Sequence, residues 1–207
     1  MAALPKYKII LPLAFIALAV VLFYLALHGS TITKGQRLAA LLSSSDNQRV
    51  VFDLPQKTSQ CQAHDGLPDH DCTPGAIFSN ASKDEICVQG YSASVRNVST
   101  LTKEAIYQAY GLAYPQTFGA YEADHLIPLE LGGSNDVANL FPEAADPKPG
   151  YHEKDLVENF LHQEVCAGRV GLGAAQRQIA RDWLAVYRNL STQQLRMLKQ
   201  QYRSWSE

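Results

Sequence analysis

Residues 121–143 read YEADHLIPLELGGSNDVANLFPE, and they are the most informative segment of the chain. It places Asp124 and His125 at the end of a short apolar strand, followed by a loop with a glycine pair. Asn139 then begins a second short strand, and a helix with apolar residues at helical spacing opens at His152. The order strand, loop, strand, helix predicts an α+β domain in which these four side chains converge.

The same order resembles the HNH nuclease family, in particular its exported bacterial members. The resemblance covers much of residues 61–188 and extends well beyond the four side chains named above. Further matching stretches are LPDHDCTPGA, ICVQGYSASVR, IYQAYGL, HEKDLVENFLHQEVCAG and AQRQIARDW. The resemblance implies a ββα-metal core, cleavage of phosphodiester bonds by water, and a nucleic acid substrate, with DNA favoured over RNA.

The resemblance also assigns roles to individual residues. It makes His125 the general base and gives a single divalent ion to Asp124 and His152. Magnesium or manganese is the expected ion, and zinc or nickel is an alternative. Asn139 would hold the loop and so orient the base. Because no CxxC pairs surround Asn139, a zinc-stapled version of the fold is not expected.

The chemistry of phosphodiester hydrolysis is consistent with these residue types. The reaction needs an activated water and a cation that neutralises charge on the phosphate and on the departing oxygen. A histidine with a pKa of about 6.5 is largely neutral near pH 7, so His125 can accept a proton from water once a neighbour fixes its tautomer. We expect Asn139 to be that neighbour. With only Asp124 and His152 as protein ligands, a hard cation keeps open positions for water and substrate.

Three further candidates lie on the first turns of the helix that opens at His152. Lys154 is a candidate phosphate contact, and Asp155 and Glu158 are candidates for supporting the metal ligands. Acidic residues are favourable near helix N-termini in any case, so Asp155 and Glu158 also have a purely structural explanation.

An uncharged apolar segment at residues 9–27, IILPLAFIALAVVLFYLAL, is long enough to cross a membrane. It is longer than a typical signal-peptide core and lacks a clear cleavage site after it, which favours an uncleaved anchor over a secreted form. We expect residues 1–30 to form the anchor, residues 31–60 a tether, and residues 61–207 the catalytic domain.

All four cysteines follow the apolar segment, which indicates two disulfides and a periplasmic or otherwise extracytoplasmic domain. Four cysteines permit three pairings, and Cys61 with Cys72 or Cys72 with Cys87 are the favoured local bridges. Cys166 is the fourth. An alternative is a zinc knot formed by Cys61, Cys72 and the two histidines between them.

Outside the central stretch the pattern is mainly helical. We expect a short helix at residues 33–42, a strand-like run at 86–98, and a helix at 103–110 capped by Thr102. Two helices follow, from residue 152 and over 172–187, and Ser191 with Gln194 forms a capping box for a last helix ending near Trp205. The C-terminal part is therefore a helical extension, and a disulfide-tied lobe precedes the core.

The net charge of −2 excludes a strongly basic mode of nucleic-acid binding. Residues 31–150 carry 8 basic and 14 acidic residues, a charge of −6, whereas residues 151–207 carry 8 and 6, a charge of +2. The C-terminal quarter is the better candidate for a phosphate-facing surface, although its arginines also suit solvated helix faces. The competing function is a membrane-tethered binding or assembly protein that keeps the fold without turnover.

Overall fold

The structure is a computed structural model that describes residues 33–42 and 52–202. The chain divides after Thr33, and the second compact unit, Lys34–Glu207, contains nearly all of the described residues. The predicted membrane segment at residues 9–27 lies outside the described residues. Within them, no helix combines the length and apolarity that crossing a membrane requires.

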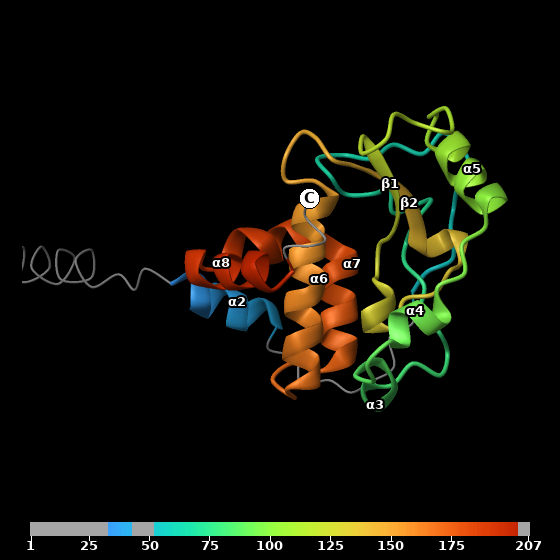
Figure 1. Cartoon of the computed structure of the whole chain (residues 1–207). Helices are drawn as coiled ribbons and strands as arrows, with labels where there is room; N and C mark the ends of the chain where they lie inside the picture. The colour runs from blue at the N-terminus through green and yellow to red at the C-terminus, as the bar shows by residue number, and fades with distance from the viewer. Residues whose placement is uncertain (1–32, 43–51, 203–207) are drawn as a thin grey trace, which may run out of the picture. The chain divides into compact units, whose positions relative to one another are not determined.

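A two-stranded antiparallel sheet lies beside one of the two long helices. Strand β1 (Tyr121–His125) pairs with β2 (Leu140–Ala144), with His125 opposite Leu140 at one end of the sheet. Helix α6 (Tyr151–Cys166) follows β2 after a short loop, so the predicted order strand, loop, strand, helix is confirmed (Figure 1). The predicted α+β class is confirmed as well.

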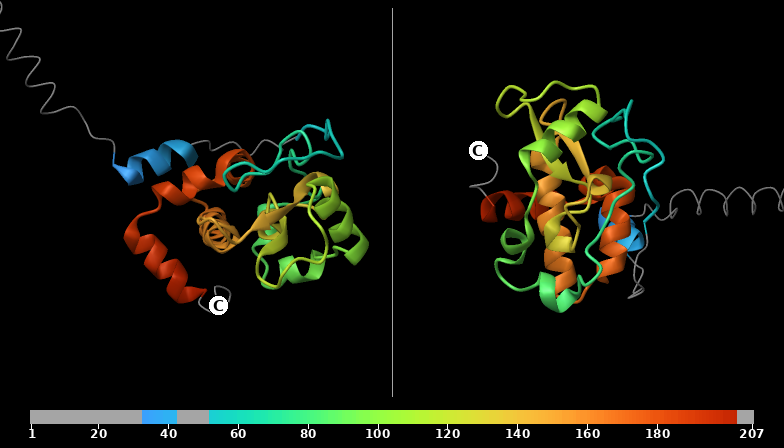
Figure 2. Two further views of the ribbon diagram at one scale, coloured as in Figure 1. Left: turned by 90° about the horizontal axis from the view of Figure 1, so that it is seen from above. Right: turned by 90° about the vertical axis from the view of Figure 1, so that its right-hand side faces the viewer.

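Helix α6 connects the two halves of the fold. It contacts β1 and the short 3-10 turn η1 (Leu129–Leu131) on one side, and α7 (Leu172–Asn189) and α8 (Thr192–Gln201) elsewhere on its surface. Figure 2 shows α6 end-on, with the strands on one side and α8 on the other. Because Lys154 on this helix contacts Asp124 and His125 on β1, the packing of α6 against the sheet positions the candidate site.

The main core lies around α6 and α7. Its largest fully buried side chain is Trp183. The Nε1 of Trp183 donates to the backbone oxygen of Gly66 at 3.0 Å, and this hydrogen bond ties the N-terminal lobe (residues 61–82) to α7. Helix α2 (Lys34–Leu42) adds the buried Leu38, and Phe52 packs against the same core. Part of the segment that we expected to be a tether therefore lies on the folded domain.

Most helix predictions are confirmed with small shifts in their ends. Helix α5 (Thr100–Ala109) begins three residues earlier than expected, because Ser99 caps it by accepting from the backbone N–H of Thr102. The capping box of Ser191 with Gln194 opens α8 as predicted. Residue 205, the expected end of that helix, lies outside the described residues.

The strand expected at residues 86–98 is wrong. A capping box opens α3 (Lys83–Ile86), and Gly90, at φ 84°, starts the short helix α4 (Tyr91–Val95). A left-handed glycine breaks an extended run, and no neighbouring strand pairs with this segment in the described part of the chain. Ile86 is the one fully buried residue of this segment.

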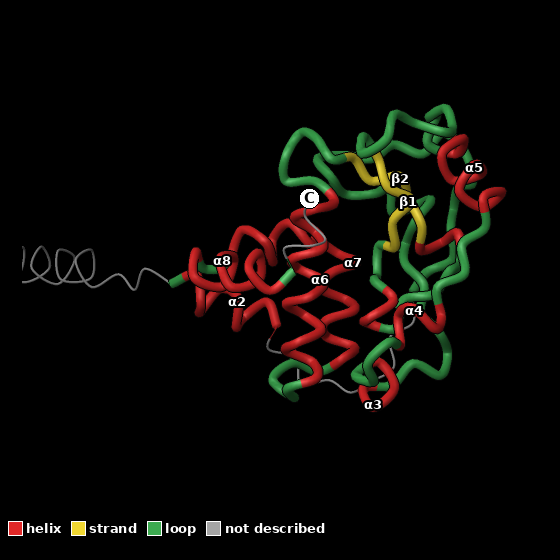
Figure 3. Tube along the Cα trace, viewed as in Figure 1, coloured by secondary structure: helices red, strands yellow, loops and turns green. Residues whose placement is uncertain are grey.

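The N-terminal lobe is built mostly from loops (Figure 3). The disulfide Cys61–Cys72 closes a small loop in it, which confirms one favoured pairing and excludes Cys72 with Cys87. The second disulfide joins Cys87 to Cys166, at the end of α6. Because Cys61 and Cys72 are bonded to each other, their sulfurs are not available as thiolates for the alternative zinc knot.

Candidate functional site

Asn139 closes the loop between the two strands. It ends the 3-10 turn η2 (Val137–Asn139) and is completely buried. Its Nδ2 donates to the backbone oxygens of Ile127 and Ser134, each at 2.9 Å, and its Oδ1 accepts from the N–H of Ile127 at 2.9 Å. Three hydrogen bonds from one buried amide fix the backbone directly after His125.

The glycine pair makes this closure possible. A Cβ atom on Gly133 would lie 1.7 Å from the backbone oxygen of Ile127, so the loop can approach the strand end only where a side chain is absent. The adjacent residue Ser134 donates its N–H to Ala76, and the N-terminal lobe thereby covers the loop from outside. The close approach at Gly133 and the hydrogen bond from Ser134 to Ala76 therefore hold the loop in place.

His125 ends β1 and is buried, with 1% of its surface exposed. Its Nε2 lies 3.1 Å from Oδ1 of Asn135, and Asn135 in turn donates its Nδ2 to the backbone oxygen of Val95. Since an amide oxygen only accepts, Nε2 carries the proton and Nδ1 keeps its lone pair. Nδ1 is buried and has no hydrogen-bond partner among the described residues.

The sequence predicts that Asn139 fixes the tautomer of His125, whereas in the structure it is Asn135 that contacts the ring. Asn135 stands two residues beyond the glycine pair, where an Asn in Ser-Asn-Asp is an ordinary turn signal. Burial lowers the pKa of His125, while the charge of Asp124 opposes this effect. The imidazole is therefore neutral near pH 7, with one nitrogen free to accept a proton.

Asp124 precedes the imidazole on β1. Its Oδ1 accepts from the backbone N–H of His125 at 2.8 Å, and its Oδ2 accepts from Nζ of Lys154 at 2.6 Å. Burial alone would raise the pKa of Asp124, but the charge of Lys154, together with the neighbouring side chain of Glu143 and the hydrogen bond of Lys154, outweighs it and lowers the pKa to about 2. Asp124 is thus a carboxylate across the physiological pH range.

Lys154 is a fully buried cation surrounded by oxygen atoms. Besides Asp124, its Nζ donates to the backbone oxygen of His125 at 2.8 Å and to Oε1 of Glu158, and it lies 3.8 Å from Oε2 of Glu143. Burial would lower the pKa of Lys154, but these carboxyl groups raise it well above its usual value. All three ammonium protons have acceptors, so Lys154 does not reach toward a phosphate in this conformation.

Burial raises the pKa of both Glu143 and Glu158 well above the usual value, with Lys154 acting in the opposite direction. The neighbouring side chain of Asp124 raises the pKa of Glu143 further. One ammonium group thus serves three carboxyl groups, of which Asp124 alone has a lowered pKa.

His152 lies on the first turn of α6. Its ring contacts that of Tyr151, with 4.2 Å between the centroids, and its Nδ1 is buried without a hydrogen-bond partner in the part of the chain that is described. His152 and Asp155 line one cavity of about 570 Å³. Burial, followed by the charge of Asp124, raises the pKa of Asp155 to about 8.

The residues around His152 fit a divalent cation. The buried imidazole nitrogen of His152, which has no partner among the described residues, is a ready ligand, and Asp155 adds a carboxyl group on the same cavity. The structure thus provides imidazole and carboxylate donors. Glu158 supports the site through Lys154.

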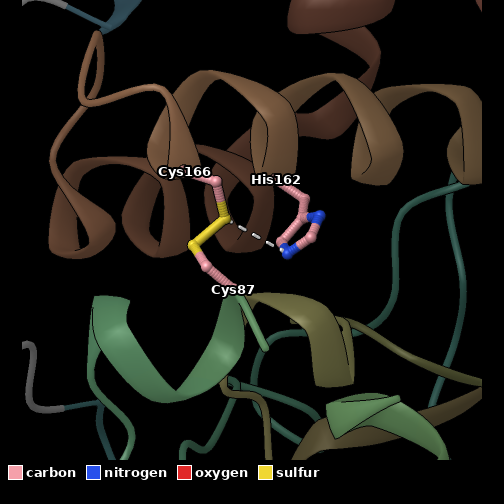
Figure 4. A group of neighbouring side chains, drawn as sticks. All are labelled: Cys87, His162 and Cys166. Carbon is pink, nitrogen blue, oxygen red and sulfur yellow. Dashed lines mark hydrogen bonds between the residues drawn. A yellow bond between two sulfur atoms is a disulfide. The ribbon is translucent and has the colours of Figure 1, made fainter. Parts of the chain in front are cut away.

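One compact group of three ligand-type side chains occurs among the described residues, namely Cys87, His162 and Cys166 (Figure 4). Its two sulfurs form a disulfide, and Nε2 of His162 lies 3.1 Å from the backbone oxygen of Ile86 and 3.4 Å from Sγ of Cys166. The group could hold a soft metal only after reduction to thiols. In the oxidised form it ties α3 to the end of α6.

Comparison with protein-family models, with curated proteins and with solved structures gives no match.

Proposed function

We propose that the chain is a metal-dependent nuclease of the HNH type, with β1, β2 and α6 as its ββα-metal core. The observation that carries the proposal is the environment of His125, a neutral imidazole oriented by Asn135 on a loop closed by Asn139. Its Nδ1 is free to accept a proton, and an ionised carboxylate precedes it. This combination is what a general base for water activation requires.

In this mechanism His125 takes a proton from water at Nδ1, and Asn135 keeps the ring in the tautomer that allows it. Asp124 and His152 would hold the ion, with Asp155 nearby. A bound magnesium or manganese ion would supply positive charge to the phosphate and to the departing oxygen. Lys154 holds Asp124 in place and prevents its protonation.

The test is cleavage of plasmid DNA, single-stranded DNA and RNA by the purified full-length chain in detergent. We expect cleavage with added magnesium, manganese, zinc or nickel and none with EDTA. His152→Ala should weaken binding of Mn²⁺, measured by calorimetry, and part of its activity should return at high Mn²⁺ because mass action refills a weakened site. A folded chain that cleaves nothing with any of these ions contradicts the proposal.

A second candidate is a membrane-tethered nucleic-acid-binding or assembly protein without turnover. The contact between Lys154 and Asp124 favours it, because the ammonium group already supplies positive charge at a carboxylate that the first proposal gives to a metal ion. Binding of labelled DNA without cleavage under every ion, and without measurable Mn²⁺ affinity, would select this candidate.

We also propose that residues 9–27 anchor the chain in a membrane and that the catalytic domain lies outside the cytoplasm. The two disulfides support this location, since such bonds persist in oxidising compartments. Protease added to spheroplasts should digest the domain together with a known external control. Protection of the domain under conditions that digest the control would overturn the proposed location.

A further inference from the structure

A cavity of about 570 Å³ opens beside the candidate metal ligand His152. It lies between α5, the loop at residues 114–120, β1 and the first turn of α6. Its volume is within the range of small-ligand pockets, about 300–1,000 Å³, and is far too small to admit a double helix. An occupant that reaches His152 through this cavity must be of nucleotide size.

Aromatic side chains dominate the lining of the cavity. The buried Tyr107 meets Tyr114 and Tyr121 edge to face, with ring centroids 5.2 and 6.4 Å apart. Tyr151 lines it beside His152, and its hydroxyl donates to the backbone oxygen of Gly119, which ties the loop to α6. These rings form a fixed aromatic wall on the side of the candidate site.

Phe118 extends this wall into solvent. It lines the same cavity at the tip of the loop, and its side chain is fully exposed, at 103%. A large apolar ring held in water has no structural use at that position, whereas an exposed ring beside an aromatic pocket can stack on a planar ligand. The loop thus presents the solvent-exposed ring of Phe118 next to the candidate catalytic centre.

The charges around the cavity suit a nucleotide. Lys103 lines it from α5 and can contact a phosphate, while the carboxyl groups of Glu122 and Asp155 can accept hydrogen bonds from the amino groups of bases. A purely apolar ligand would not use these three side chains. A base stacked on the rings, with its phosphate near Lys103 and His152, uses them all.

We propose, on the basis of the proposed function, that this pocket binds an unpaired nucleobase next to the scissile phosphate, which makes single-stranded nucleic acid the preferred substrate class. Paired bases in a duplex cannot enter without being flipped out, at a cost of a few kcal/mol. Stacking on aromatic rings tolerates any base, so the preference concerns strandedness and carries little sequence information.

The test is binding of fluorescent 12-nucleotide strands to the full-length chain in detergent, measured by anisotropy in EDTA so that cleavage plays no part. The probes are oligothymidylate, oligouridylate and a DNA duplex of equal length. We expect tighter binding of both single strands than of the duplex. Phe118→Ala should weaken single-strand binding by about 5- to 100-fold, the range for loss of one stacked base, and leave duplex binding unchanged.

Met197→Ala is the matched control, because Met197 is also an exposed apolar side chain but lies on α8, away from the cavity. Equal affinity for duplex and single strands, or a Phe118→Ala variant that binds like the control, overturns the inference. If the proposed nuclease function is wrong but the pocket inference is right, the chain should bind single strands tightly in EDTA and cleave nothing when metal is added. Circular dichroism of each variant confirms that the exposed substitution leaves the fold intact.

Discussion

The Nζ atom of Lys154 lies 2.6 Å from Oδ2 of Asp124, the carboxylate that precedes the candidate base His125. The same ammonium group donates to the backbone oxygen of His125 and to Glu158. A single buried cation therefore fixes both the side chain of Asp124 and the backbone of His125. This contact joins α6 to β1 at the point where the proposed chemistry takes place.

Replacing Lys154 with Met should destabilise the domain by about 3–5 kcal/mol, because buried carboxyl groups lose their partner. Urea unfolding followed by circular dichroism measures the change. Lys199→Met is the control, since Lys199 is exposed on α8, and it should change the free energy of unfolding by less than about 0.5 kcal/mol. Equal stability of the two variants would show that the ion cluster does not hold the site together.

Asp124 should impose a specific pH dependence on stability. Its pKa falls from 3.8 to about 2 on folding, so its ion pair stabilises the folded state above about pH 4, and this stability is lost as the pH falls through about 2. The difference in unfolding free energy between wild type and Asp124→Asn should thus be constant near neutrality, at roughly 2 kcal/mol or more, and shrink in acid. A difference that grows as the pH falls contradicts this assignment.

Asn139 and Asn135 should respond differently to substitution by Ala. Asn139→Ala leaves buried backbone groups of Ile127 and Ser134 without partners, which should cost about 3 kcal/mol in unfolding free energy. Asn135→Ala frees the ring of His125, so it should lower cleavage activity and shift its pH profile with a smaller loss of stability. Two variants with the same stability and the same activity would refute the separate roles.

Purified native protein should contain no free thiols, because both disulfides are formed in the folded domain. The bridge between Cys87 and Cys166 spans 79 residues, and the bridge between Cys61 and Cys72 spans 11. On loop entropy alone, removing the first should cost about 4 kcal/mol and removing the second about 3 kcal/mol. Alkylation followed by mass spectrometry counts the thiols, and four free thiols in native protein would contradict the structure.

The local parts of the site could be predicted from the sequence. The two strands around the glycine pair and the helix that follows could be predicted from turn signals and apolar spacing, whereas the roles of Asp124, His125, Asn139 and His152 come from the resemblance to the HNH nuclease family and stay predictions. These features depend on residues that are close in the chain, where periodicity and turn chemistry are informative. The helices α6, α7 and α8 were predictable for the same reason.

Long-range contacts could not be predicted in this way. The partner of Asp124 is Lys154, 30 residues further on, and its identity depends on how α6 docks against β1. The contact of Asn135 with His125 depends on the shape of a loop, and the bridge between Cys87 and Cys166 joins distant segments. The strand-like run at residues 86–98 forms short helices instead, because Gly90 is left-handed and no strand pairs with this segment in the described part of the chain.

The most direct test of the proposed nuclease compares cleavage rates of wild type, His125→Ala and His64→Ala under saturating Mn²⁺. His64 is an exposed loop residue, so its variant controls for loss of an imidazole elsewhere. We predict that His125→Ala loses activity by about 10²–10⁴-fold with Mn²⁺ binding retained, that His64→Ala cleaves like the wild type, and that EDTA stops all cleavage. A His125→Ala variant as active as wild type, or cleavage that persists in EDTA, would contradict the account.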